Sequence, residues 1–238
     1  MDVEEVVSEL RGLARPCDLD TLARYGIFGD EILGVRTPDL VRLAKRLGKD
    51  HSLALGLWRT GIYEARHLAV LVDDHAKVTE AQMERWARDF DSWAICDGAC
   101  VHLFSWTRFA YDKATEWSSR EEEYVKRAGF VLMAVLSVHD KQAADSVFLG
   151  YLPAIARAAT DERTYVKKGV NWALRQIGKR NRRLNKAAIG AAVKISRIDS
   201  KAARWIASDA LRELRGDAVQ RRLASKAPGV RPGRGPRS

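Results

Sequence analysis

The sequence predicts an all-α fold in which paired helices stack into a solenoid. Long segments rich in Ala, Leu, Arg and Glu contain few β-branched runs, which favours helix. Only 6 prolines occur in 238 residues, most of them at segment starts or near the C-terminus, and no strand-like pattern interrupts the helical periodicity. The hydrophobic share of 46% and the charged share of 30% indicate a globular chain and exclude a disordered one.

The first elements are set by an apolar face and by residues that start or stop helices. A first helix is predicted over 2–15, because its valines and leucines recur on one face, and Pro16 ends it. A short second helix follows and runs to Tyr25. Either Asp18 or Asp20 is suited to cap this helix, because aspartate side chains accept hydrogen bonds from free backbone amides.

Helical hairpins account for the rest of the chain. Thr37 is predicted as an N-cap with Pro38 at the first helical position, and this helix stops at Gly48. The helices that follow are expected in pairs joined by short turns, which is typical of an antiparallel array. The pairs are 51–59 with 63–73, 79–90 with 92–106, 108–117 with 121–137, 141–159 with 162–178, and 182–195 with 200–214.

An internal repeat supports a solenoid of the HEAT type. The segment Tyr-Val-Lys-Arg-Ala-Gly at 124–129 matches Tyr-Val-Lys-Lys-Gly-Val at 165–170, 41 residues later, and weaker echoes lie at 64–69 and 201–206. The second helix of each pair is predicted to line a concave face, with basic residues in its first turn. A basic row at helix N-termini suits phosphate binding. The equivalent positions are Arg66, Asp97, Arg127, Lys168 and Arg204.

The charge is unevenly distributed. The net charge is +10, and residues 161–238 hold 21 Lys and Arg against 6 Asp and Glu. A basic second half indicates a polyanionic partner, most simply nucleic acid, although a merely soluble basic protein would have the same balance. We expect one domain over 1–222 and a flexible basic tail over 223–238, whose last part, 226–238, is dominated by Pro, Gly and Arg.

No metal or cofactor motif stands out. The three cysteines do not suggest a disulfide framework, and the five histidines are scattered without a second ligand at helical spacing. No N-terminal run resembles a signal peptide, and no stretch of about 20 apolar residues occurs. We therefore expect no cofactor and no metal, no membrane association, and a cytoplasmic protein that associates with the nucleoid when it is bound to DNA.

One carboxylate interrupts the basic row. Trp93 and Asp97 lie four residues apart, so one helix would project an aromatic ring and a carboxylate together. Aromatic faces suit nucleobases or cations, and an isolated carboxylate suits a developing positive charge or an attacking water. The alternative is structural: Trp93 would be a core residue, and Asp97 would pair with a neighbouring arginine.

With these residues in view, the chain resembles the AlkD-type DNA alkylation-repair glycosylases, a family of HEAT-like repeat proteins. The resemblance covers about Val3 to Leu214. Its marks are Tyr25 followed nine residues later by Gly34-Val35-Arg36-Thr37-Pro38, then Ser92-Trp93-x-x-x-Asp97, Val125-Lys126-Arg127-Ala128 and Lys168-Gly169-Val170-Asn171-Trp172-Ala173-Leu174-Arg175. The family often has a second Trp and an Asp where this chain has Ser92 and Ala94, which leaves the implied catalytic residues intact and substrate breadth open.

The resemblance implies hydrolysis of the N-glycosidic bond of N3- and N7-alkylated purines, such as 3-methyladenine and 7-methylguanine, in duplex DNA without base flipping. By this resemblance, Asp97 is the catalytic aspartate and Arg127 is the active-site arginine. The resemblance also implies that Trp93 and Trp172 flank the deoxyribose and that Tyr25 lies near the lesion. It implies no cofactor. Together with the basic row, it leads us to expect DNA contacts from Tyr25, Arg66, Lys126, Lys167, Lys168 and Arg204.

The resemblance leaves two other classes of function open. A non-catalytic HEAT-repeat module that binds nucleic acid or an acidic protein would account equally well for the repeats and the basic half. A helical interaction scaffold would instead carry apolar strips in place of the basic row. A carboxylate among cations favours the enzyme, because a pure phosphate binder gains nothing from it. We expect a monomer that has no obligate protein partner and binds duplex DNA containing alkylated purines.

Overall fold

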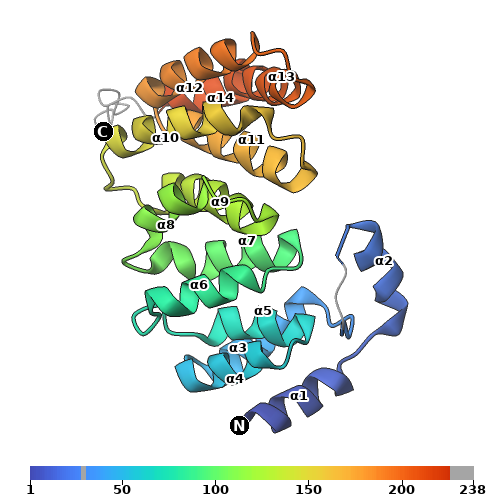
Figure 1. The fold of residues 1–238 in the computed structure, drawn as a ribbon. Coiled ribbons are helices and arrows are strands. Elements are labelled where there is room, and N and C mark those ends of the chain that lie inside the picture. Colours follow the sequence, from blue (N-terminus) through green and yellow to red (C-terminus); the bar gives the residue numbers. More distant parts are fainter. Residues whose placement is uncertain (28–30, 226–238) are drawn as a thin grey trace, which may run out of the picture.

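The computed structural model describes residues 1–27 and 31–225, and within these ranges it contains fourteen α-helices and no strand (Figure 1). The predicted all-α array of paired helices is confirmed. No helix of the described residues is both long and apolar enough to cross a membrane. The helices are α1 Val3–Gly12, α2 Leu19–Arg24, α3 Thr37–Leu47, α4 His51–Arg59, α5 Tyr63–Val72, α6 Glu80–Arg88, α7 Trp93–His102, α8 Ala110–Trp117, α9 Glu123–His139, α10 Asp145–Arg157, α11 Thr164–Gly178, α12 Arg182–Ile195, α13 Lys201–Arg215 and α14 Asp217–Ser225.

The second helices of the pairs form one continuous row. Helix α5 packs on α7, α7 on α9, α9 on α11, and α11 on α13. The first helices cover this row, with α4 on α5, α8 on α9 and α12 on α13. Figure 1 shows the resulting stack, which runs from α1 at one end to α13 and α14 at the other.

Helix α9 forms the centre of the core. Twelve of its 17 residues are buried, and it contacts α7, α8 and α11. Gly129 lets the end of α8 approach closely, because a Cβ at this position would lie 2.4 Å from the Ser118 amide nitrogen. The long apolar run from 128 to 136 is therefore buried on all sides, which explains why it shows little amphipathic periodicity.

Local capping fixes where several helices begin. Six N-cap side chains accept a hydrogen bond from the backbone amide three residues on, which satisfies a donor that has no partner inside the helix. Each such cap stabilises its helix by about 0.5–2 kcal/mol. These residues are Asp2, Asp50, Thr79, Ser92, Asn181 and Ser200.

Some predicted boundaries differ from the structure. Thr37 is the first helical residue of α3 and Arg36 is its N-cap. The predicted helix over 92–106 breaks at Leu103, which leaves the helical region of backbone conformation, and a short 3₁₀ turn follows over 104–106. The boundary predicted after residue 222 falls inside α14, an unpredicted helix that buries Leu223. The predicted tail over 226–238 lies outside the described residues.

A buried carboxylate attaches the N-terminal arm, residues 13–27 and 31–36, to the helical stack. Glu64 on α5 is fully buried and accepts hydrogen bonds from three consecutive amides, those of Leu33 (2.9 Å), Gly34 (2.7 Å) and Val35 (3.2 Å). Gly34 has φ +78°, and a Cβ there would lie 2.4 Å from the Arg15 carbonyl oxygen. The Gly-Val-Arg-Thr-Pro motif therefore fixes the path of the arm that carries α2.

Candidate functional site

A cavity of about 460 Å³ lies between the end of α2 and the first turns of three second helices, α7, α9 and α11. The first-turn positions of neighbouring repeats face the same side of the row, so residues far apart in sequence meet here. The cavity is lined by Ala23, Arg24, Tyr25, Gly26, Trp93, Asp97, Arg127, Tyr165 and Lys168.

Trp93 connects the helical stack to the N-terminal arm. It is the first residue of α7, and the buried side chain of Ser92 caps this helix by accepting a hydrogen bond from the Ile95 amide at 3.4 Å. The indole Nε1 of Trp93 donates to the Tyr25 carbonyl oxygen at 2.8 Å. Trp93 is therefore a wall of the cavity and a tether for the arm, and Ser92 has a structural role.

Asp97 and Arg127 form a bidentate ion pair at the base of the cavity. Arg127 Nε donates to Asp97 Oδ1 at 2.8 Å, and Arg127 Nη2 donates to Oδ2 at 2.7 Å. Arg127 Nη1 also donates to the Tyr165 carbonyl oxygen at 2.6 Å, which ties α9 to α11. The side chains are 18% exposed for Asp97 and 7% for Arg127, so the pair is shielded from water but the carboxylate still reaches the cavity.

The environment of this pair shifts both pKa values. Burial raises the pKa of Asp97, and the hydrogen bonds and charge of Arg127 offset this effect only in part. Burial disfavours the charge on Arg127, but the hydrogen bonds and charge of Asp97 outweigh burial and raise its pKa. Asp97 is therefore a more basic carboxylate than an ordinary aspartate, held in one orientation by a permanent cation.

Two tyrosines complete the rim of the cavity. Tyr25 is 66% exposed. Tyr165, which the sequence did not single out as a site residue, places its hydroxyl 3.5 Å from the Gly26 carbonyl oxygen and its ring 5.6 Å from that of Tyr124. The Lys168 ammonium lies 6.0 Å from the centre of the Tyr165 ring. The signal for Tyr165 was present in the repeat, since Tyr124 and Tyr165 occupy equivalent positions.

Trp172 is separate from this group. It lies on α11 one turn beyond Lys168, and its half-buried ring packs against the hydrophobic core. It is not among the described residues that line the cavity. The structure thus brings Asp97, Trp93, Arg127 and Tyr25 together and leaves Trp172 outside the cavity.

The basic row is largely neutralised by neighbouring carboxylates. Arg66 is paired with Asp91 at 2.8 Å and also lies over the Trp58 ring. Lys126 lies 3.1 Å from Asp161, and Arg204 lies 2.9 Å from Asp199.

Two lysines on α11 differ from these paired cations. In residues 1–27 and 31–225, no carboxylate lies within 4.0 Å of the ammonium of Lys167 or Lys168. The Lys167 ammonium lies 5.6 Å from the Trp205 ring, and Lys168 is exposed at the cavity rim. Lys167 and Lys168 are therefore the predicted DNA contacts whose charge remains available to a phosphate.

None of the three cysteines is among the residues that line the cavity. Cys96 and Cys100 are buried in α7, Cys17 is exposed, and none of the three is in a disulfide. Over the described parts of the chain, no group of three or more His, Cys, Asp or Glu side chains has the geometry to hold a metal ion. The chemistry available in the cavity is therefore that of one carboxylate, two kinds of cation and three aromatic rings.

Comparison with known proteins agrees with this architecture. No curated protein sequence matches the chain. One solved structure, described as a new family of proteins related to the HEAT-like repeat DNA glycosylases with affinity for branched DNA structures, superposes with a TM-score of 0.74 at 21% identity, over 88% of this chain and 94% of that chain. This likeness confirms the HEAT-like fold. A family model described as DNA alkylation repair enzyme matches residues 6–214, and the chain therefore belongs to the DNA alkylation repair enzyme family.

Proposed function

We propose that this chain is a DNA glycosylase that hydrolyses the N-glycosidic bond of cationic N3- and N7-alkylated purines in duplex DNA without base flipping. The observation that carries the proposal is the Asp97 carboxylate, held by Arg127 in a cavity that also presents Trp93 and Tyr25. Membership of the DNA alkylation repair family supports the choice of substrate.

Cleavage of this bond calls for a carboxylate that stabilises positive charge, and it does not call for a general acid that protonates the leaving base. An alkylated purine of this kind already carries a positive charge, so it leaves without being protonated. Positive charge then develops on the deoxyribose, and a nearby carboxylate stabilises that charge or orients the attacking water. Aromatic faces such as that of Trp93 add cation–π attraction to the same charge.

The geometry of the ion pair suits this task. A carboxylate offers about four lone-pair directions, and Arg127 occupies one on each oxygen of Asp97. The remaining directions are free to accept a hydrogen bond from a water. Arg127 acts as a positioning residue, because its two hydrogen bonds prevent the carboxylate from rotating. Lys168 at the rim is suited to a phosphate beside the lesion.

The test is release of 7-methylguanine or 3-methyladenine from methylated duplex DNA under single-turnover conditions with a chelator present. We expect wild-type protein to release the base and Asp97→Asn to release it at least 100-fold more slowly, while both bind duplex DNA with similar affinity. The amide keeps the shape and one acceptor of the carboxylate but loses the charge. Equal rates for the two proteins would rule out the proposed role of Asp97.

A second candidate is a DNA-binding module without glycosylase activity. It is favoured by the similar solved structure, whose family is described as having affinity for branched DNA, and by the position of Trp172 away from the cavity. In that case neither protein would release a base, and a three-way junction would bind more tightly than a linear duplex of the same length. Base release by wild type would rule out this candidate.

A further inference from the structure

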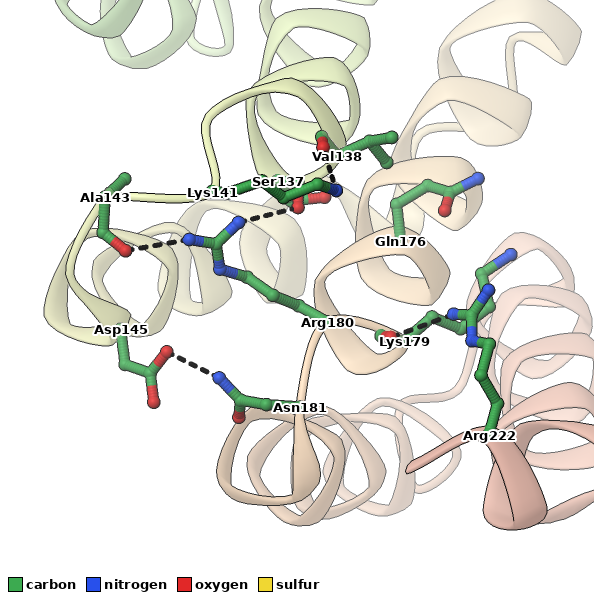
Figure 2. A pocket seen from close by; sticks show the side chains of 10 residues that line it. All are labelled: Ser137, Val138, Lys141, Ala143, Asp145, Gln176, Lys179, Arg180, Asn181 and Arg222. Atoms are coloured by element: carbon green, nitrogen blue, oxygen red, sulfur yellow. Dashed lines mark hydrogen bonds between the residues drawn. The ribbon is translucent and has the colours of Figure 1, made fainter. Parts of the chain in front are cut away.

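A second cavity, of about 340 Å³, is drawn in Figure 2. Its lining residues lie at the opposite ends of helices α9 and α11 from those of the Asp97 site. Four cationic side chains and one carboxylate contribute to its wall. Its lining consists of Ser137, Val138, Lys141, Ala143, Asp145, Gln176, Lys179, Arg180, Asn181 and Arg222. Along α9, ten residues separate Arg127 from Ser137, a rise of about 15 Å, so the two cavities are distinct.

Two of the four cations hold the wall in place. The Arg180 guanidinium donates to the carbonyl oxygens of Ser137 (3.0 Å) and Ala143 (2.8 Å), as Figure 2 shows. It also donates to the carbonyl oxygen of Asp140 (2.6 Å), so that it caps the end of α9. Lys179 is paired with Glu213 at 2.6 Å. Their charges are thus used within the protein.

The other two cations, Lys141 and Arg222, are exposed at the mouth of the cavity. Each donates to a backbone carbonyl, Lys141 to that of Val138 and Arg222 to that of Lys179. Within the described part of the chain, neither has a carboxylate within 4.0 Å. The one carboxylate of the lining, Asp145, accepts a hydrogen bond from Asn181 at 2.7 Å. Two unneutralised positive charges therefore face the same opening, which suits a phosphate.

An exposed aromatic pair is formed by Trp106 and by His139, the residue that follows Val138 of the lining. Trp106 is 53% exposed, although tryptophan is usually buried, and it stacks on His139 with ring centres 5.0 Å apart and planes 26° apart. Val138, the residue before His139, lines the cavity and is itself 40% exposed.

Lys141 lies close enough to affect His139 directly. Burial lowers the pKa of His139, and the charge of Lys141 lowers it further. The lowered pKa favours the neutral form of His139, and the stacked pair offers a flat aromatic surface near Lys141.

We propose that these residues form an edge site (Trp106, His139, Lys141 and Arg222) that binds an unpaired DNA strand, with one phosphate at Lys141, another at Arg222 and a base stacked on Trp106. Cations beside a solvent-facing aromatic ring are the combination by which proteins hold single strands, because every unpaired base exposes a face that can stack. A duplex buries those faces between its own base pairs. The edge site goes beyond the proposed glycosylase activity and does not depend on it.

The test is the binding of a fluorescently labelled oligothymidine of about 8 nucleotides, within the range that compact single-strand sites cover, followed by anisotropy at several salt concentrations. We expect Trp106→Ala to weaken binding about tenfold, since stacking on an aromatic ring contributes on that scale, and Trp106→Phe to retain most of the affinity. We expect the double variant Lys141→Ala/Arg222→Ala to reduce the slope of log K against log salt by about 1.4, or about 0.7 for each lost phosphate contact.

A matched control removes a charge far from the site. Arg42 on α3 is exposed at the other end of the stack, so Arg42→Ala lowers the net charge by one without touching the edge site. Oligothymidine affinity within twofold of wild type for both Trp106→Ala and the double variant would overturn the proposal. So would an edge site that binds inorganic phosphate or an acidic peptide but not the oligothymidine.

Failure of the edge site and failure of the glycosylase proposal are distinguishable. Asp97→Asn tests excision and is expected to leave oligothymidine binding unchanged, because the Asp97 cavity is separate. Trp106→Ala is expected to leave excision from a methylated linear duplex unchanged, since that substrate offers no unpaired strand. A wild-type protein that binds the oligonucleotide through Trp106 but releases no base would support the edge site alone.

Discussion

Replacing Arg127 with methionine tests whether the buried ion pair holds the candidate site together. The side chain of Arg127 is 7% exposed, and it makes two hydrogen bonds to Asp97 and one to the Tyr165 carbonyl oxygen. Methionine fills a similar volume but leaves the carboxylate and the carbonyl without their donor. Breaking a buried ion pair by removing one partner costs about 3–5 kcal/mol.

We expect the lower end of that range for Arg127→Met, about 3 kcal/mol, because Asp97 keeps 18% exposure and can be partly hydrated through the cavity. For a chain of this length, this corresponds to a decrease in Tm of roughly 6–12 °C. The assay is urea unfolding at pH 7. The double variant Arg127→Met/Asp97→Asn carries no buried charge at this position. Its loss of unfolding free energy should therefore be about 2 kcal/mol smaller than the sum of the losses for the two single variants.

The pH dependence gives an independent check on the same variant. Arg127 supplies the hydrogen bonds and the charge that lower the pKa of Asp97, so without it this pKa rises further above its ordinary value. The destabilisation of Arg127→Met relative to wild type should be fully present above that raised pKa. This destabilisation should decrease as the pH falls through the raised pKa of Asp97, because a neutral carboxylic acid needs no cation.

An exposed ion pair provides the matched control. Arg42 pairs with Asp39 on the surface and its side chain is 73% exposed, so Arg42→Met should cost less than about 1 kcal/mol. Two results would refute the reasoning about Arg127. The first is a loss of unfolding free energy for Arg127→Met that is as small as the loss for the control. The second is a loss for the double variant that equals the sum of the losses for Arg127→Met and Asp97→Asn to within about 0.5 kcal/mol.

Three further predictions follow from the site and the core. Base excision should rise with pH as Asp97 loses its proton, with a midpoint above 3.8 because burial raises its pKa; a single-turnover pH profile with no such step contradicts this. Gly129→Ala should destabilise the protein by roughly 1–3 kcal/mol, because the added methyl group would clash with the α8–α9 connection. Gly190→Ala on α12 should be neutral or stabilising, because the space around Gly190 is open. Thermal unfolding of both variants compares them directly. Glu64→Gln should leave one of three buried amides poorly satisfied and so loosen the N-terminal arm. Trypsin should therefore cleave the variant between residues 11 and 36 at least several-fold faster than it cleaves wild type. Equal cleavage rates would show that the carboxylate does not hold the arm.

The sequence was sufficient for those features that depend on near neighbours in the chain. Helix periodicity, the capping side chains and the four-residue spacing of Trp93 and Asp97 are local, so the all-α fold and the shared face of α7 could be predicted directly. The series of equivalent repeat positions also implied that Asp97 and Arg127 would occupy equivalent turns of adjacent second helices. The structure pairs them at 2.7–2.8 Å, as the structural alternative for Asp97 required, and keeps the carboxylate within the cavity.

Only the tertiary structure decided which of the candidate residues meet and which charges stay free. Tyr165 reaches Gly26 across 139 residues, while Trp172 turns to the core, and Arg66 and Arg204 are neutralised by Asp91 and Asp199. The exposed pair of Trp106 and His139 depends in the same way on how α7 and α9 end side by side. Contacts of this kind depend on how whole helices pack, and a side chain contributes a free charge only if packing brings no opposite charge to it.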